Sequence, residues 1–102
     1  MSTVKKTKIL TEINITDKGT FKFKNKKVTQ SCNKRLVTKC LSIIDGMKNI
    51  EDLWKFPGLH AERLRLKRDL LYGNYSCRVD KRYRLMFDLP VNKNKIFLAD
   101  YH

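Results

Sequence analysis

Three stretches near the end of the chain decide the fold: YSCRV at residues 75–79, RYRLMFDL at residues 82–89 and KIFLADY at residues 95–101. Each is rich in aromatic, β-branched or other apolar residues, and only a few polar or turn-forming residues separate one from the next. Runs of this kind joined by short loops are typical of an antiparallel meander. We therefore expect three consecutive strands that form the centre of a sheet.

The first part of the chain adds a possible hairpin. Residues 8–15 and 20–24 have the composition of strands, and the second of these alternates apolar with basic side chains. Asp17-Lys18-Gly19 between them is turn chemistry. These features predict a hairpin or two short edge strands ahead of the helical region.

The middle of the chain changes period. From Lys26 to Met47 apolar residues recur at three- and four-residue steps, which predicts an amphipathic helix, with a break near residues 31–33 into two helices as an alternative. Residues 50–54 predict a further short helical turn. The alternation of leucine with basic residues in 60–69 favours an exposed strand or extended segment, and His60 is interpreted as a surface or capping residue. Helices followed by an antiparallel sheet give the fold class α+β.

Composition limits the classes of function. The 102 residues fit one domain, 1–102, in which residues 1–20 form an N-terminal extension or an extra hairpin. Lys and Arg number 23 against 10 Asp and Glu, and this excess favours phosphate backbones or an acidic protein as partners. There is no apolar run of the roughly 20 residues that a membrane span needs, and no apolar signal core, so we expect a cytoplasmic protein without a membrane partner. The three cysteines suggest neither a disulfide framework nor a zinc site.

The central strand has two chemically different faces. Period-two alternation puts Arg82, Arg84 and Met86 on one face and Tyr83, Leu85 and Phe87 on the other, and Arg78 shares the parity of the arginines. The apolar face is expected to pack against the helices. The cationic face is either the solvated outside of a half-exposed sheet or a surface that binds phosphate.

The last three residues, Asp100, Tyr101 and His102, are all proton-active and follow directly on the strand pattern. Cleavage of RNA through its 2′-hydroxyl needs a base, an acid and a cation for the phosphoryl oxygens, and arginine suits the last task because its planar fork matches phosphate. Asp100 stands alone among carboxylates here, so we expect a metal-independent route. By alternation, Asp100 and His102 share the face of Arg84, whereas Tyr101 points toward the core unless the end of the strand twists.

These residues also carry a family resemblance. Residues 59–65 (LHAERLR), 75–79, 82–87 and the final Asp-Tyr-His resemble HigB-type toxins of the RelE/ParE superfamily of bacterial type II toxin–antitoxin systems, over roughly residues 21–102. The resemblance implies N-terminal helices packed on a curved antiparallel sheet. It also implies a ribosome-dependent mRNA endoribonuclease without a cofactor, which acts on mRNA in the ribosomal A site and is silenced by a cognate, HigA-like antitoxin.

The same resemblance assigns roles to single residues. Asp100, Tyr101 and His102 match the catalytic group, and Arg84 matches the strand arginine that holds the scissile phosphate. The family also uses a basic residue, usually lysine, before the central strands. Lys67 is favoured for it, although the register leaves Arg65 as an alternative. The basic residues assigned to RNA binding are Arg65, Arg68, Arg78 and Arg82.

Two other functions compete with the nuclease. A ParE-like toxin that poisons DNA gyrase by binding would not need the terminal Asp-Tyr-His with Arg84. A basic RNA-binding module without toxin activity would need only the net charge of +13.

Overall fold

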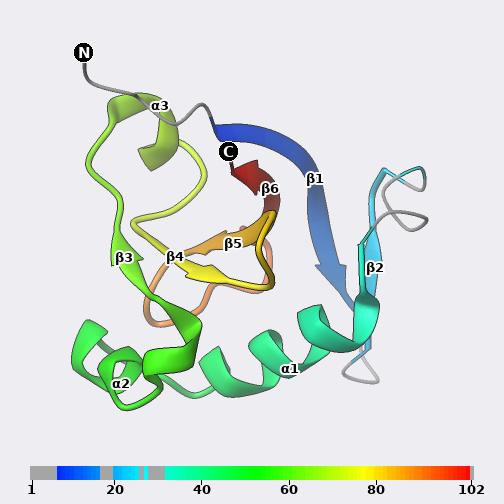
Figure 1. Ribbon diagram of the computed structural model, residues 1–102. Helices are drawn as coiled ribbons and strands as arrows, with labels where there is room; N and C mark the ends of the chain where they lie inside the picture. Colours follow the sequence, from blue (N-terminus) through cyan, green and yellow to red (C-terminus); the bar gives the residue numbers. More distant parts are fainter. Residues whose placement is uncertain (1–6, 17–19, 26, 28–31, 102) are drawn as a thin grey trace.

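The computed structural model describes residues 7–16, 20–25, 27 and 32–101, without the side chains of Thr7 and Tyr101. A six-stranded antiparallel sheet forms its centre, in the order β2-β1-β6-β5-β4-β3. Helix α1 lies across one side of this sheet and the short helix α3 lies on the other (Figure 1). The fold class α+β is confirmed, and the expected meander is present as β4 (Tyr75–Arg78), β5 (Tyr83–Phe87) and β6 (Phe97–Tyr101).

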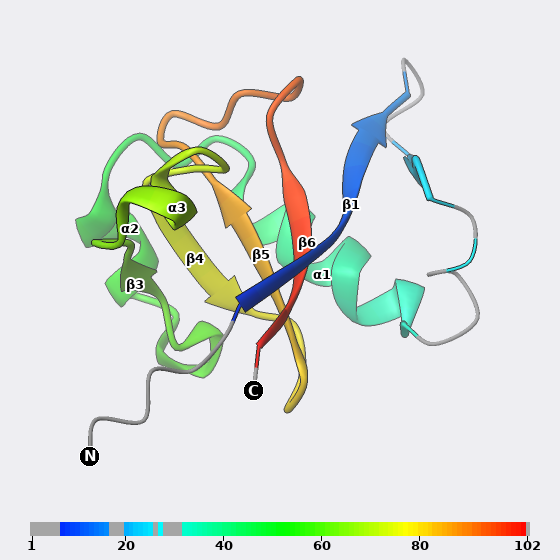
Figure 2. The same cartoon turned by 90° about the horizontal axis from the view of Figure 1, so that it is seen from above.

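The order of elements differs from the expected one, because strands precede the helices. Strand β1 (Thr7–Ile15) pairs with β2 (Phe21–Phe23), so the hairpin pairing is confirmed, while its predicted turn at residues 17–19 lies outside the described residues. The other edge of β1 pairs with β6 (Figure 2). The N-terminal placement of the helices is therefore not confirmed, whereas the strands predicted ahead of the helical region are present. β1 supplies backbone partners to β6, whose N–H and C=O groups would otherwise form an exposed sheet edge.

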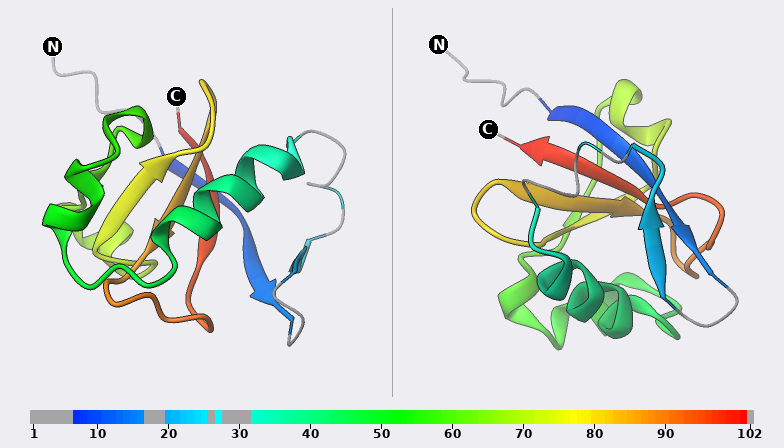
Figure 3. Two further views of the ribbon diagram at one scale, coloured as in Figure 1. Left: turned by 90° about the horizontal axis from the view of Figure 1, so that it is seen from below. Right: turned by 90° about the vertical axis from the view of Figure 1, so that its right-hand side faces the viewer.

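Helix α1 (Lys34–Ile44) begins later than the periodicity indicates. The side chain of Asn33 caps it by accepting a hydrogen bond from the backbone N–H of Arg35 at 3.0 Å, which matches the alternative of a break at residues 31–33. Upstream, most of the predicted helical stretch lies outside the described residues. Val37, Cys40 and Ile44 form the buried face of α1, which packs on the sheet as Figure 3 shows from below.

The segment between α1 and β4 is built of short elements. Helix α2 (Ile50–Trp54), predicted from the sequence, has a capping box formed by Asn49 and Asp52 and is followed by the 3₁₀ turn η2 (Pro57–Leu59). Strand β3 (Glu62–Arg63) agrees with the predicted extended segment. The extended prediction is wrong at its end, where Lys67–Leu70 form helix α3, because the N–H groups of Asp69 and Leu70 both bond to the carbonyl of Leu66.

The core lies between α1 and one face of the sheet. Tyr83, Leu85 and Phe87 belong to it, as their alternation predicts. The opposite face carries Arg84 and Met86, and we call it the arginine face. Both residues are buried, since Met86 is 1% exposed and Arg84 is 7% exposed. The interpretation of this face as a solvated surface is therefore wrong.

Candidate active site

A tight turn brings two arginines side by side on the arginine face. The carboxylate of Asp80 accepts hydrogen bonds from the backbone N–H groups of Arg82 and Tyr83, each at 2.8 Å, and so fixes the link between β4 and β5. In the resulting register Arg78 lies directly opposite Arg84. Opposed residues of an antiparallel pair project to the same face, so the two predicted RNA contacts Arg78 and Arg84 are neighbours.

Arg84 is held in a defined orientation by two acceptors. Its Nε donates to Ser76 Oγ at 3.2 Å, and its Nη2 donates to the backbone carbonyl of His60 at 2.6 Å. Ser76 is 2% exposed, and His60 adopts a left-handed conformation (φ 45°) directly after η2. A non-glycine residue in that conformation is strained. The strained residue, His60, is the one whose backbone carbonyl accepts the hydrogen bond from Arg84. The arrangement fixes a charged guanidinium within the sheet.

Asp100 lies on the other side of the sheet from Arg84. It is paired with Tyr83, and its neighbour Ala99 is paired with Arg84. The expectation that Asp100 shares the face of Arg84 is therefore wrong. Alternation within β6 does not set its register against β5, and the observed register puts Asp100 opposite Tyr83, on the face away from Arg84.

The partner of Asp100 is Arg82. Two nitrogens of Arg82, Nε and Nη2, each lie 2.9 Å from the same carboxylate oxygen of Asp100, and the guanidinium also lies over the ring of Tyr83. The Asp100 side chain is buried, whereas that of Arg82 is largely exposed. The hydrogen bond to Asp100 raises the pKa of Arg82 above its already high ordinary value, so this arginine stays charged. The ion pair fixes the end of β6 to the β4–β5 turn.

The remaining terminal residues are described only in part. The backbone of Tyr101 ends β6 and pairs with Thr7 of β1, whereas the Tyr101 side chain and His102 lie outside the described residues. The prediction that Tyr101 and His102 take part in proton transfer stays a prediction.

The upstream basic residues lie on the segment that crosses the arginine face. Arg65 follows β3, and Lys67 and Arg68 open α3; all three are exposed. The chain then passes over the sheet, where the ring of Tyr72 packs edge-on against Phe97 of β6, their centroids 5.0 Å apart. Phe97 is paired with Met86, which lies two residues along β5 from Arg84. The structure thus places the Lys67 segment and Arg84 over the same face of the sheet.

A glycine permits this close crossing. A Cβ atom added at Gly73 would lie 2.6 Å from both the backbone N and the backbone O of Phe87, and φ at Gly73 is 154°. No side chain fits there without displacing β5. Gly73 therefore allows the connection between α3 and β4 to pass in close contact with the backbone of β5.

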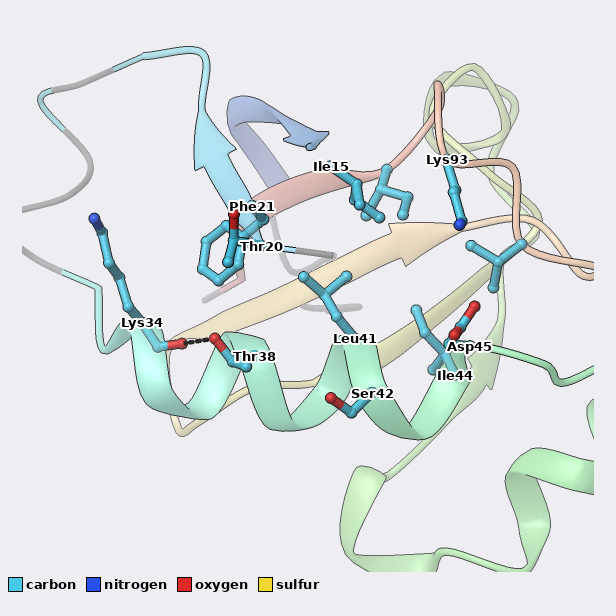
Figure 4. Close-up of a pocket in the computed structure, with 12 residues that line it drawn as sticks. Ile15, Thr20, Phe21, Lys34, Thr38, Leu41, Ser42, Ile44, Asp45 and Lys93 are labelled. Carbon is cyan, nitrogen blue, oxygen red and sulfur yellow. Dashed lines mark hydrogen bonds between the residues drawn. The ribbon is translucent and has the colours of Figure 1, made fainter. Parts of the chain in front are cut away.

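A hollow of about 350 Å³ lies away from these groups, between α1, the β1–β2 hairpin and the loop before β6 (Figure 4). Ile15, Phe21 and Leu41 supply apolar walls, and Lys34 and Lys93 stand at its margins. None of the predicted site residues lines it. Lys34, Asp45 and Lys93 are the charged residues of its lining.

The three cysteines lie in the interior of the protein. Cys32, Cys40 and Cys77 are free thiols, and all three are buried. Burial raises the pKa of Cys32 to about 11. A hydrogen bond between Cys40 and Cys77 lowers the pKa of Cys40 and raises that of Cys77. Over the described ranges no group of three His, Cys, Asp or Glu side chains is placed to hold a metal ion, and no helix there has the length and apolar character to cross a membrane.

Sequence reasoning missed two contributors to this site. Ser76 has the parity of Arg78 and is the one serine of β4, a signal that was available. The His60 carbonyl left no such signal, because its contact with Arg84 depends on a backbone conformation and on a residue 24 positions away.

Comparison with known proteins gives one match. A family model described as HigB-like toxin, RelE-like toxin of type II toxin–antitoxin system HigB, matches residues 14–102. Comparisons with curated proteins and with solved structures give no match.

Proposed function

This chain belongs to the HigB-like family of RelE-like type II toxins, and on that premise we propose that it is a ribosome-dependent, metal-independent endoribonuclease that cleaves mRNA in the A site and so inhibits translation. Membership of a type II family implies an antitoxin partner, and toxins of this type are generally RNases. The cognate antitoxin proposed here is HigA-like and acts on the toxin in the cytoplasm.

The observation that carries the proposal is the fixation of Arg84. A buried guanidinium held by Ser76 and the His60 carbonyl, with Arg78 beside it, is a preorganised cation on a sheet face. Preorganised charge stabilises a developing phosphoryl dianion without reorganisation during the reaction. A protein that needed only net charge to bind RNA would have no use for such a costly arrangement.

In the proposed reaction the 2′-oxygen of the RNA attacks the adjacent phosphorus as its proton passes to a base. The bond from phosphorus to the 5′-oxygen breaks, and an acid protonates that oxygen. We assign the charge on the phosphoryl oxygens to Arg84 and the proton transfers to Lys67, Tyr101 and His102. Asp100 is assigned a positioning role, because its carboxylate is already bonded to Arg82 at 2.9 Å and faces away from Arg84.

Three exposed basic residues and the half-buried Arg78 complete the proposed site. Arg65 and Arg68 flank Lys67 on the segment above the sheet, and Arg78 lies opposite Arg84. They would hold the RNA backbone by charge, so their contribution should decrease as salt increases. Arg82 is predicted to contribute less to RNA binding than the others, because Asp100 neutralises it.

Inducible expression with mapping of mRNA 5′ ends tests the proposal. The intact protein should stop growth and produce cuts at fixed positions within codons. Arg84→Ala should abolish the cuts, while Arg35→Ala, which removes an exposed arginine of α1, should keep them. Circular dichroism of each variant checks folding, and Arg84→Lys, which keeps the charge but loses the fork, should retain only weak cleavage.

Other outcomes point to the competing functions. Growth arrest without codon-positioned cuts, together with inhibited DNA gyrase, would replace the nuclease by a ParE-like toxin. RNA binding without arrest or cuts would leave a basic RNA-binding module.

A further inference from the structure

Strand β1 lies mostly outside the family-matched part of the chain. Its residues 7–13 precede residue 14, where the match begins. In the right-hand view of Figure 3, β1 (blue) and β6 (red) run side by side. Residues of β1 pair with β6 on both sides of a register shift between Ile9 and Thr11.

The first part of β1 pairs with the end of β6. Thr7 lies opposite Tyr101, Lys8 opposite Asp100 and Ile9 opposite Ala99. Ala99 is also the residue opposite Arg84 on the other neighbour of β6. Ala99 and Asp100 of β6 are thus held between β5 and residues 8–9 of β1, and Tyr101 pairs with Thr7 of β1.

The second part of β1 is fixed independently. Thr11 pairs with Leu98, Ile13 is fully buried in the core, and the N–H of Ile13 donates to the carbonyl of Ile96 at 2.8 Å. The register shifts between Ile9 and Thr11, which is a bulge. A bulge re-aims the residues on one side of it, and here it places Lys8 directly opposite the Asp100 that Arg82 already contacts.

From these contacts we propose that residues 7–9 are a clamp that positions the C-terminal catalytic segment. They supply the second neighbouring strand of Ala99 and Asp100 and pair with Tyr101, and Lys8 adds a cation across from Asp100. The clamp holds the residues after Ala99 in register with Arg84 and so keeps the proton-transfer groups at a fixed distance from the phosphate site. This inference rests on the proposed function for its effect on cleavage, but the pairing itself can be measured without RNA.

Two truncations of the full chain test the clamp. Removal of residues 1–6 leaves every β1 residue that pairs with β6, whereas removal of residues 1–9 takes away Thr7, Lys8 and Ile9 and leaves Thr11 and Ile13 in place. Hydrogen exchange of the amides of residues 99–101 should be at least about tenfold faster in the longer truncation. Its cleavage in a translation extract should fall by a similar factor with unchanged affinity for the ribosome, because binding surfaces remain.

A charge reversal decides the matter if the longer truncation does not fold. Lys8→Glu places a carboxylate opposite Asp100, while Lys22→Glu makes the same change of net charge on β2, opposite Asn14. Only Lys8→Glu should speed exchange at residues 99–101 and slow cleavage.

The outcomes separate the two proposals. Equal exchange at residues 99–101 in the two truncations and the two lysine variants would overturn the clamp. Faster exchange with undiminished cleavage would overturn its role in catalysis. An intact chain that cleaves no mRNA would end the nuclease proposal, while the exchange measurements would still decide whether the clamp exists.

Discussion

The hydrogen bond between Ser76 and Arg84 makes a quantitative prediction about stability. Ser76→Ala removes the Oγ that accepts from Arg84 Nε, and both residues are buried, to 2% and 7% exposure. Hydrogen bonds to charged groups contribute about 1.5–3 kcal/mol. The 3.2 Å distance is longer than the optimum for such a bond, which places this one at the lower end. We expect Ser76→Ala to lower the free energy of unfolding by about 1.5 kcal/mol.

The change should be visible in thermal unfolding followed by circular dichroism. For a domain of this size, 1 kcal/mol shifts Tm by about 4–8 °C, so Ser76→Ala should lower Tm by roughly 8 °C. Ser42→Ala is the matched control, because Ser42 is an exposed residue of α1 and its replacement should change stability by less than about 0.5 kcal/mol.

A double-mutant cycle assigns the loss to the bond itself. Arg84→Met removes the donor and keeps an unbranched side chain of related length, although the His60 carbonyl then also loses its partner. With Ser76→Ala and Arg84→Met combined, the coupling free energy should be about 1 kcal/mol. A coupling within about 0.3 kcal/mol of zero would show that Ser76 stabilises the protein by packing alone and that Arg84 is not held by it.

Three further predictions follow from the structure. Gly73→Ala should destabilise the protein by roughly 3 kcal/mol in urea unfolding, because the added Cβ would lie 2.6 Å from the Phe87 backbone. Gly58→Ala, where the added Cβ would meet open space, should leave stability almost unchanged. Equal effects of the two substitutions would contradict the close approach of Gly73 to β5. His60→Gly should preserve mRNA cleavage, because Arg84 contacts the backbone carbonyl of this residue and glycine readily adopts a φ of 45°. His60→Val should impair cleavage, because a β-branched residue is strained at that φ. Loss of cleavage in His60→Gly would instead assign a role to the imidazole. Burial raises the pKa of Cys32 to about 11, above the pKa of about 8.5 of an exposed thiol. The unfolded state therefore loses this proton first, and stability should fall as the pH rises from about 9 toward 11. Cys32→Ala should remove that part of the pH dependence in unfolding experiments at about pH 8 and 10.

Local patterns were sufficient for several parts of the protein. The alternation in residues 82–89 predicted a strand with Tyr83, Leu85 and Phe87 in the core, because the period of two is a property of the strand itself. The motifs in residues 59–65, 75–79 and 82–87, with the final Asp-Tyr-His, carried the resemblance that the family match confirms. The asparagine before α1 agreed with the alternative helix start, since capping depends on neighbours in sequence.

The placement of Asp100 and the role of β1 were decided only in three dimensions. Residue types in the last strand determined its chemistry, but not which residue of β5 it would face, and the pairing of Asp100 with Tyr83 turned its carboxylate away from Arg84. The pairing of β1 with β6 around the bulge near Leu10 likewise connects residues far apart in sequence. The hydrogen bond from Arg84 to the His60 carbonyl does the same. Alternation is set by adjacent peptide units, whereas register is set by the partner strand, and a shift of one residue changes every face without changing the pattern.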